Sequence, residues 1–202
     1  MFDLEEITSE LARAVAVIKR GGVVAFPTET YYGLAVDPFN HKALQRLFSI
    51  KQRPVIKPIL TLISAASQLS CLAADIPPLF SPLMTRYWPG PLTLVFPARP
   101  GLSPLLTAGS GTVGARISSH PVAQALARLA AAPITATSAN ISGLSPALSA
   151  ADIHEQFGNK LDMVIDAGPA AGGLGSTVVG ASQDGLVMLR RGVVSLTELQ
   201  DV

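Results

Sequence analysis

The sequence predicts a single α/β domain built on a mixed β-sheet with helices packed against it. Helical and strand-like hydrophobic periodicities alternate along the chain, and no internal repeat, charge block or linker interrupts them. The chain has 202 residues, which is enough to bury one substantial core. Hydrophobic residues make up 49% of it, while 16 prolines and 17 glycines separate the periodic stretches, as in a globular protein with many connections.

The N-terminal part of the chain predicts two helices and two strands. Residues 7–20 are expected to form an amphipathic helix, which ends at the Gly-Gly pair after it. An apolar strand over residues 23–27 follows. Asn40 is the expected N-cap of a second helix over residues 41–50. Residues 58–63 then have the apolar character of a buried strand.

The middle of the chain continues the alternation. Residues 77–88 predict a helix, and the Trp-Pro-Gly-Pro motif at its end separates it from a strand over residues 92–96. A further strand is expected at residues 112–117. The helix predicted at residues 120–132 has Pro121 in its first turn, where a missing N–H does no harm.

The next segment predicts a strand at residues 134–137 that delivers Ser138 at its end. A helix over residues 149–157 and a strand over residues 163–166 follow. The glycine-rich residues 168–175 are expected to form a loop.

The C-terminal part predicts two paired strands, at residues 176–179 and 186–189, across a turn that contains an Asp-Gly pair. Ser195 and Glu198 have capping-box spacing for a short terminal helix. Hairpin-like neighbours near these strands and near Leu92 argue against a purely parallel sheet. The order of the strands is left open.

Four polar side chains just past predicted regular structure indicate a binding site for a polyanion. Lys51 and Arg53 follow a helix, and Ser138 and Asn140 follow a strand with the same one-residue spacing. Lys and Arg are charge-assisted donors suited to phosphate, and Ser and Asn add neutral donors and acceptors. Lys57 is near enough to join them. Since no glycine-rich phosphate loop is present, side chains would hold the phosphates; the alternative is a solvated basic helix end.

Two further segments have both a functional and an ordinary interpretation. Thr28, Glu29 and Thr30 put two hydroxyls and a carboxylate at a strand end, where Glu29 would orient a metal or an amine. Spacing alone favours an ordinary strand-to-turn transition. Arg116 stands among apolar residues in a strand, so it either points into a cleft to hold a ligand carboxylate or pairs with an acidic residue.

Other strand ends also carry polar groups, and the usual catalytic motifs are missing. Ser142, Ser176, Arg190 and Arg191 suit ribose or phosphate oxygens, with ordinary turns as the alternative. The sequence has no H-E-x-x-H, C-x-x-C or G-x-S-x-G motif. The histidines are expected to be helix caps or surface residues: His41, His120 and His154. Many anion binders without a nucleophile suit an enzyme that aligns its reactants.

Composition excludes several other classes of protein. A net charge of +1 argues against a broad nucleic-acid surface. Cys71, the single cysteine, predicts a buried small hydrophobe and excludes a disulfide framework. The acidic N-terminus lacks the basic region of a signal peptide, and no window approaches the roughly 20 apolar residues that span a bilayer. We therefore expect a cytoplasmic protein with no membrane partner.

Seven motifs together resemble those of the YrdC/Sua5 family, the threonylcarbamoyl-adenylate synthases. They occur in the family's order from about Gly21 to Gly192, and they read FPTETYYGLA, SIKQRPVIKPI, YWPGPLTLVFP, TVGARISSHP, TSANISG, STVV and LRRG. Each motif is weak alone, but seven in sequence with sensible spacing are specific. The resemblance implies one YrdC-like domain over residues 1–202, twisted around a positively lined concave cleft, without the C-terminal extension of longer members.

The resemblance also implies a reaction. L-Threonine, bicarbonate and ATP would give threonylcarbamoyl-AMP and pyrophosphate, with Mg²⁺ accompanying the ATP. Downstream threonylcarbamoyl-transferase proteins would then modify an adenosine in certain tRNAs. Neither chemical step requires a protein nucleophile, which agrees with the missing motifs.

The same resemblance assigns residues to subsites. The family's Lys-x-Arg and Ser-x-Asn tetrad, associated with ATP, matches Lys51, Arg53, Ser138 and Asn140, with Lys51 and Arg53 as the catalytic pair. Neighbouring nucleotide-contacting positions match Lys57, Thr112, Ser145 and Arg190. Positions associated with threonine match Thr30, Arg116 and Ser176, of which Arg116 suits the carboxylate. No residue is assigned to a metal.

This chain departs from the family pattern chiefly near the threonine positions. Tyr31 stands where Val is commoner, and Ala35 where Gly is frequent. Leu62 replaces a frequent His, and Ala136 an occasional Thr. The loop that contains Ser145 is one residue shorter than usual. These changes leave the choice of amino acid open.

Three alternatives accompany this interpretation. One is a paralogue of the same fold without the activity, against which the complete tetrad argues. Another is a relative that uses carbamoyl phosphate in hydrogenase maturation, which would carry fused acylphosphatase or zinc-finger segments. The third is a module that binds double-stranded RNA, or the tRNA itself, by shape and phosphate contacts.

Overall fold

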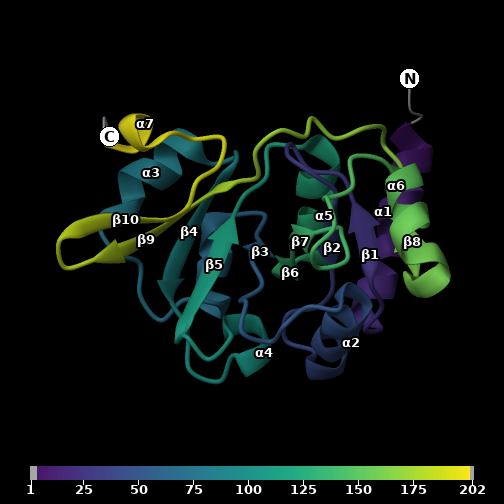
Figure 1. Cartoon of the computed structure of the whole chain (residues 1–202), viewed down its shortest axis with the longest axis horizontal. Coiled ribbons are helices and arrows are strands. Elements are labelled where there is room, and N and C mark those ends of the chain that lie inside the picture. The colour runs from purple at the N-terminus through teal and green to yellow at the C-terminus, as the bar shows by residue number, and fades with distance from the viewer. Residues whose placement is uncertain (1–3, 201–202) are drawn as a thin grey trace.

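Two mixed β-sheets stand side by side in the structure, a computed structural model that describes residues 4–200 (Figure 1). The α/β class and the mixed strand directions are thus confirmed, although the sequence predicted one sheet rather than two. The predicted domain limits, residues 1 and 202, lie outside the described residues.

The smaller sheet has the strand order β7-β2-β1-β8. Its strands are β1 (Val24–Phe26), β2 (Gly33–Ala35), β7 (Thr137–Ser138) and β8 (Met163–Val164). Strand β2 runs antiparallel to both β1 and β7, whereas β8 runs parallel to β1. The central pair is fully buried, which is why its residues are almost all apolar.

The larger sheet has the order β10-β9-β4-β5-β3-β6. Its strands are β3 (Thr61–Leu62), β4 (Leu92–Pro97), β5 (Thr112–Arg116), β6 (Ile134–Thr135), β9 (Thr177–Ser182) and β10 (Gly185–Arg190). The predicted pairing of the last two strands is confirmed, since β9 and β10 form an antiparallel hairpin. Strand β4 pairs antiparallel with β5 and parallel with β9.

Helices cover the sheets and fill the connections between strands (Figure 1). The α-helices are α1 (Leu4–Lys19), α2 (His41–Lys51), α3 (Phe80–Tyr87), α4 (Pro104–Thr107), α5 (Pro121–Ala130), α6 (Ala150–Phe157) and α7 (Leu196–Gln200). Two 3₁₀ turns are η1 (Ala66–Cys71) and η2 (Gly158–Lys160). Every helix predicted from periodicity is present.

Helices α1 and α5 pack together against the smaller sheet. Apolar residues of both, including Leu11 and Leu126, join Val24 and Phe26 of β1 in one buried cluster. A second, larger cluster of buried apolar residues includes Phe80 of α3 and Phe96 of β4, whose rings meet edge to face with 5.1 Å between their centroids. This geometry contributes roughly 0.5–1.5 kcal/mol beyond the burial of the rings.

The helix ends show why these segments start and stop where they do. The side chain of Asn40 accepts a hydrogen bond from the Ala43 amide at 3.1 Å, which confirms it as the N-cap of α2. At the other end, Gln52 adopts a left-handed conformation with φ of 49° and turns the chain away from the helix axis. Ser195 and Glu198 exchange the two hydrogen bonds of the predicted capping box.

Two further expectations from the sequence are wrong. The strand predicted at residues 134–137 is divided: β6 belongs to the larger sheet and β7 to the smaller, because the Ala136 amide between them bonds to the Leu60 carbonyl at 2.8 Å. Cys71 is exposed rather than buried. It ends the 3₁₀ turn η1, whose inward-facing residue is Leu69.

None of the helices within residues 4–200 is long and apolar enough to cross a membrane.

Candidate active site

A cavity of about 470 Å³ opens where the two sheets meet. The smaller sheet and its loops contribute one side of it, including Thr30, Gly33 and Ser138. The larger sheet contributes the other side, including Arg116 and Ser176. Its size lies within the range of small-molecule sites, and both sheets are needed to form it.

Four arginines line this cavity: Arg53, Arg116, Arg190 and Arg191. Burial lowers the pKa of Arg53, and the charge of Arg190 lowers it further. Burial also lowers the pKa of Arg190, with the charge of Arg116 acting in the same direction. A guanidinium keeps its charge at neutral pH, so the cations that line the cavity repel one another. An anionic ligand would reduce this repulsion.

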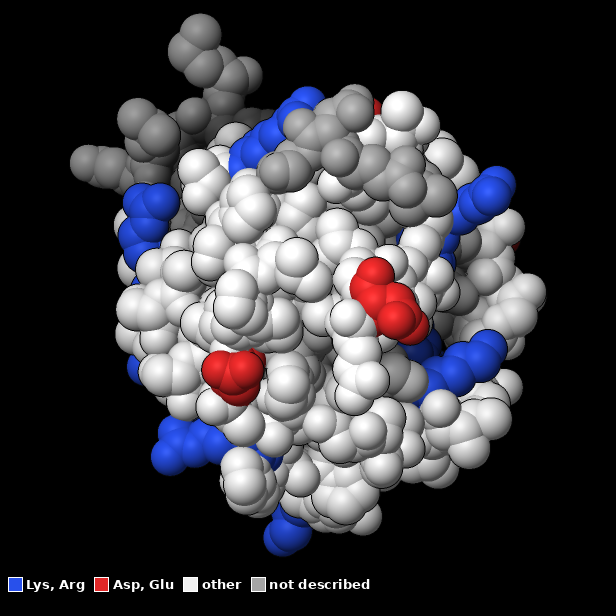
Figure 2. All heavy atoms as spheres, turned by 90° about the vertical axis from the view of Figure 1, so that its left-hand side faces the viewer, with Lys and Arg blue, Asp and Glu red and all other residues white. Residues whose placement is uncertain are grey.

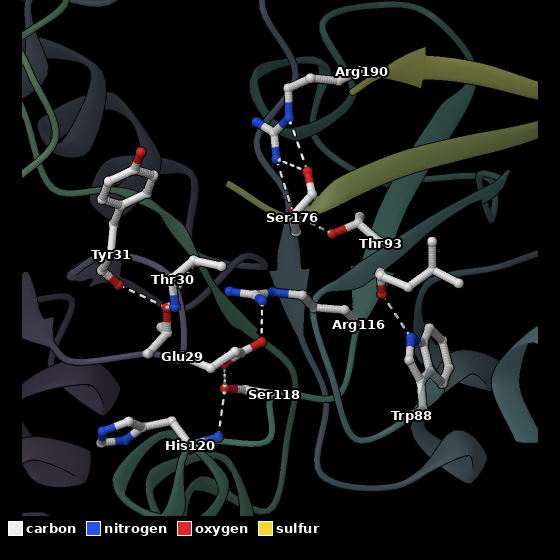
Figure 3. Close-up of polar contacts among 12 residues, drawn as sticks. Glu29, Thr30, Tyr31, Trp88, Thr93, Arg116, Ser118, His120, Ser176 and Arg190 are labelled. Atoms are coloured by element: carbon white, nitrogen blue, oxygen red, sulfur yellow. Dashed lines mark hydrogen bonds and ion pairs between the residues drawn. The ribbon is translucent and has the colours of Figure 1, made fainter. Parts of the chain in front are cut away.

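Arg116, at the end of β5, is almost fully buried and forms an ion pair with Glu29 through its Nη1 atom (Figure 3). The predicted pairing with an acidic residue is confirmed, and Arg116 also lines the cavity, while its role in holding a ligand carboxylate stays a prediction. Burial lowers the pKa of Arg116 and the Glu29 charge opposes this shift. The second carboxylate oxygen of Glu29 accepts a hydrogen bond from the Ser118 hydroxyl.

The Thr-Glu-Thr segment forms the turn that spacing alone favoured. The Thr28 hydroxyl donates to the Tyr31 carbonyl at 2.7 Å and accepts from the Thr30 amide at 3.2 Å. Thr28, Thr30 and Tyr31 line the cavity, but Glu29 is turned away from it toward Arg116. This geometry favours a structural role for Glu29 over the alternative in which it orients a metal or an amine.

Ser176, just before β9, is held by side chains from the two neighbouring strands, Thr93 of β4 and Arg190 of β10. Arg190 Nη2 donates to its carbonyl at 2.8 Å and contacts its hydroxyl at 2.9 Å, and the Thr93 hydroxyl lies 2.9 Å from the same hydroxyl (Figure 3). Ser176 is buried, whereas Arg190 is exposed and lines the cavity. This network fixes a hydroxyl beside a cation at the cavity wall.

Lys51 is in a different environment from Arg53. Its side chain is 1% exposed, and Nζ donates to the Ser138 carbonyl and, at 2.8 Å, to the Asn140 carbonyl. Burial lowers its pKa to about 7, and the charge of Arg53 acts in the same direction. The solvated helix end is therefore wrong for Lys51. Because Gln52 is left-handed, Arg53 turns instead to the cavity.

Asn140 turns inward to its own loop. Its Oδ1 accepts from the Ser138 hydroxyl at 2.7 Å, and its Nδ2 donates to the Ile141 and Leu144 carbonyls. These bonds give the loop the side-chain-stabilised turn that the sequence left as an alternative. Lys51 and Asn140 thus shape the loop that presents Ser138.

The predicted site residues divide into two groups. Those that line the cavity are Thr30, Arg53, Thr112, Arg116, Ser138, Ser176 and Arg190. Those outside its lining are Lys51, Lys57, Asn140 and Ser145. The side chains of Lys57 and Ser145 are exposed, and their carbonyls accept hydrogen bonds from Arg53 Nε and Gln156 Nε2.

Sequence reasoning missed several lining residues, including Tyr31, Ser110 and Thr137. Tyr31 also donates its hydroxyl to the Gly173 carbonyl in the glycine-rich loop. The sequence did contain a signal for Tyr31, because it stands where Val is commoner in the family motif. Of the three other departures from the family pattern, Ala136 lines the cavity, whereas Ala35 and Leu62 are buried outside its lining.

The histidines and possible metal ligands lie elsewhere. His41 and His154 are exposed, as expected. His120 occupies the N-cap position of α5 but makes no capping hydrogen bond with its side chain, and its Nδ1 has no hydrogen-bond partner among the described residues. Within residues 4–200 no group of three His, Cys, Asp or Glu side chains is placed to hold a metal ion.

The fold and the site define an α/β protein with a small-molecule-sized cavity between two mixed sheets. Arginines and hydroxyl groups line the cavity, and no histidine or cysteine of the described part of the chain does. The family model for Sua5, YciO and YrdC, described as "Telomere recombination", matches residues 16–192. The chain belongs to this family, which confirms the resemblance seen in the seven motifs.

Known relatives support this membership. The threonylcarbamoyl-AMP synthase of Bacillus subtilis strain 168 is 38% identical over 194 residues, which are 96% of this chain and 56% of the relative. The counterpart from Idiomarina loihiensis is 42% identical over 151 residues, covering 72% of this chain and 79% of the relative.

Solved structures show the same fold. The crystal structure of P. abyssi Sua5 complexed with L-threonine matches with a TM-score of 0.92 and 38% identity, over 96% of this chain and 57% of that one. The crystal structure of E. coli YciO matches with a TM-score of 0.84 and 25% identity, over 95% and 93% of the two chains. The chain spans little more than half the length of the Bacillus and Pyrococcus relatives.

Proposed function

We propose that this protein is a threonylcarbamoyl-AMP synthase, which joins L-threonine, bicarbonate and ATP and releases pyrophosphate. One observation carries the proposal: residues that the family motifs associate with ATP and residues that they associate with threonine line the same cavity. Arg53, Ser138 and Arg190 represent the first group, and Thr30 and Arg116 the second. The names of the relatives support the same activity.

The chemistry requires alignment rather than a protein nucleophile. The threonine amine attacks bicarbonate-derived carbon, forming an N–C bond and losing a proton and water to give a carbamate. A carbamate oxygen then attacks the α-phosphorus of ATP, and the bond between the α-phosphorus and the bridging oxygen breaks to release pyrophosphate. Holding three reactants in one site removes much of the entropic barrier. A cavity lined by cations and hydroxyls also stabilises the charge that develops on phosphate oxygens.

The cations divide between the substrates in this proposal. Arg53 and Arg190 would contact the triphosphate, because each combines a cationic fork with a position at the cavity wall. Arg116, deeper and already paired on one side, would hold the threonine carboxylate. Lys51 would serve the nucleotide by fixing the loop of Ser138, since direct contact with phosphate would require breaking its two hydrogen bonds to that loop.

Mg²⁺ would come with the nucleotide. Among residues 4–200, the cavity lining offers cations and hydroxyls and no carboxylate, a donor set that suits phosphate oxygens better than a bare divalent ion. The ion, held by the triphosphate and aided by hydroxyls such as those of Thr112 and Ser138, would neutralise charge as pyrophosphate leaves. The product would pass to threonylcarbamoyl-transferase proteins that modify tRNA, and a cytoplasmic location remains a prediction.

RNA binding is the alternative function from another class. The face shown in Figure 2 is mostly uncharged, with Lys and Arg scattered toward its edge rather than gathered in a patch. This agrees with the net charge of +1 and favours a small-molecule site over a broad phosphate-binding surface.

The proposal is tested by pyrophosphate release with ATP, Mg²⁺, bicarbonate and a panel of amino acids. We expect release that depends jointly on L-threonine and bicarbonate. Release with another amino acid would keep the chemistry and change the substrate. No release from folded protein would favour a paralogue without the activity, and steeply salt-dependent RNA binding without turnover would favour the RNA alternative.

A further inference from the structure

The carboxylate of Glu29 connects the two sheets beside the cavity, through Arg116 and Ser118. Glu29 lies in the turn between β1 and β2 of the smaller sheet. Its Oε1 pairs with Nη1 of Arg116, and its Oε2 accepts from the hydroxyl of Ser118. Arg116 is the last residue of β5 in the larger sheet, and Ser118 lies two residues after it. The side chains of Arg116 and Glu29 are only 7% and 14% exposed.

Glu29 does not line the cavity, whereas Arg116 does. Figure 3 shows the Arg116 guanidinium extending toward Thr30, with Glu29 and Ser118 grouped on one side of it. A guanidinium carries five N–H donors in a fixed plane. Fixing Nη1 on one carboxylate oxygen therefore fixes the direction of the donors that remain for a ligand.

We propose that Glu29 is a positioning residue, which orients the guanidinium of Arg116 so that its free donors meet the carboxylate of the amino-acid substrate. The identity of that substrate rests on the function proposed above. Glu29 does not contact the ligand in this arrangement. Its effect on substrate reaches the cavity through Arg116.

The groups around Glu29 hold it in place before any ligand arrives. The Thr28 hydroxyl accepts from the Thr30 amide and donates to the Tyr31 carbonyl, so the turn on either side of Glu29 is bonded to itself. On the opposite side, the His120 amide donates to the Ser118 oxygen at 3.2 Å. A carboxylate held at both oxygens is preorganised and loses little freedom when it holds a cation.

Arg116 needs such a partner because another cation stands near it. The charge of Arg190 acts on the same part of the cavity, and a buried guanidinium without a counter-ion would be driven to reorient or to take up water. A role for Glu29 as the base that accepts the amine proton is the competing idea. Both of its oxygens are already engaged by protein donors, which argues against that role.

Ligand binding to the full chain tests the proposal through Glu29→Gln, which keeps the shape and removes the charge. We expect the Kd for L-threonine, measured by calorimetry, to rise about tenfold while the Kd for ATP changes less than about twofold. Asp162→Asn is the matched control, because Asp162 pairs with Arg46 on the surface, outside the cavity lining. It should change neither Kd by more than about twofold.

A double variant separates positioning from a direct role. If Glu29 acts through Arg116, Glu29→Gln combined with Arg116→Gln should bind threonine no more weakly than Arg116→Gln alone. The proposal would be overturned if the fold-changes in threonine Kd of the two single variants multiplied in the double variant. An unchanged threonine Kd in Glu29→Gln would also overturn it. A lower kcat at unchanged Kd, with loss of the acidic limb of the pH–rate profile, would indicate the general-base role instead. Should Glu29→Gln not fold, Ser118→Ala removes one anchor of the carboxylate and should weaken threonine binding about threefold.

A measurement without substrate makes the test independent of the proposed function. In the NMR spectrum of the ligand-free protein, the Nη–H signals of the Arg116 guanidinium should be resolved and protected from exchange, because Nη1 is held by Glu29, and Glu29→Gln should broaden or remove them. If the unmodified protein bound no threonine, the proposed function would fail while these signals still decided the positioning role. Arg116 signals unchanged in Glu29→Gln would refute that role.

Discussion

The buried amine of Lys51 should make the stability of this protein rise with pH. Burial lowers the pKa of this amine from its ordinary value of 10.5 to about 7. The unfolded chain therefore keeps the proton at pH values where the folded protein has released it. Because the unfolded state then binds more protons, the free energy of unfolding increases with pH between these two values.

The magnitude follows from the size of the shift. Each pH unit in this window is worth about 1.4 kcal/mol, so the gain between about pH 7 and about pH 9 is at most about 3 kcal/mol. The Ser138 and Asn140 carbonyls that accept from Nζ favour the charged amine and reduce this gain. Higher pH is unsuitable, because burial raises the pKa of Tyr32 to about 12 and stability falls once the unfolded chain ionises its tyrosine above about pH 10.

Urea unfolding at the two pH values measures the effect in the unmodified protein, in Lys51→Met and in Lys42→Met. Lys42 is an exposed lysine of the same helix and should keep the full pH response. Lys51→Met should lose it, and at the higher pH should be less stable by about 1–3 kcal/mol because two loop carbonyls lose their donor. An equal pH response in Lys51→Met would refute the assignment of the effect to this amine.

Three further predictions concern binding and stability. Arg53→Ala should raise the KM for ATP about tenfold to a hundredfold with little change for threonine, whereas Arg116→Ala should do the reverse; steady-state kinetics showing the opposite split would exchange the two subsites. Gly192→Ala should lower the free energy of unfolding by about 3 kcal/mol in chemical denaturation, because the added Cβ would overlap backbone atoms of the adjacent segment. Gly109→Ala is the control: it has open space around the new Cβ at φ of 70° and should lower the free energy of unfolding by only about 1–2 kcal/mol. Equal losses in the two variants would contradict the overlap. Asn40→Ala should lower the free energy of unfolding by about 1 kcal/mol through loss of the α2 cap, and no loss in the same assay would count against that cap.

Local signals in the sequence predicted local structure well. The cap of α2 at Asn40, the capping box from Ser195 to Glu198 and the C-terminal hairpin all depend on residues within a few positions of one another. The polar residues at strand ends were also recognised as a group, and several of them line one cavity. Strand ends meet at sheet edges, so this part of the site follows from the order of elements.

Features that depend on distant partners were not predictable. Glu29 and Arg116 are 87 positions apart, so nothing in either segment identifies the pair. The division of residues 134–138 between two sheets depends on a bond from Ala136 to Leu60 in another strand. Periodicity describes one segment at a time and carries no information about such contacts.

The Lys-x-Arg pair shows a second limit. Lys51 and Arg53 are two residues apart, and the sequence pattern predicts that both bind phosphate. Gln52 between them adopts a left-handed conformation that is uncommon for a residue other than glycine, so the two side chains point to different environments. One is buried under a loop and the other lines the cavity.

The central claim is that one cavity condenses three substrates into a threonylcarbamoyl adenylate. The most direct test incubates the protein with ATP, Mg²⁺, L-threonine and ¹³C-bicarbonate and analyses the products by mass spectrometry. The proposed function predicts an adenylate that contains threonine and one ¹³C atom, formed in equal amount with pyrophosphate. An adenylate without the label, or ATP cleaved without any threonine adduct, would contradict it.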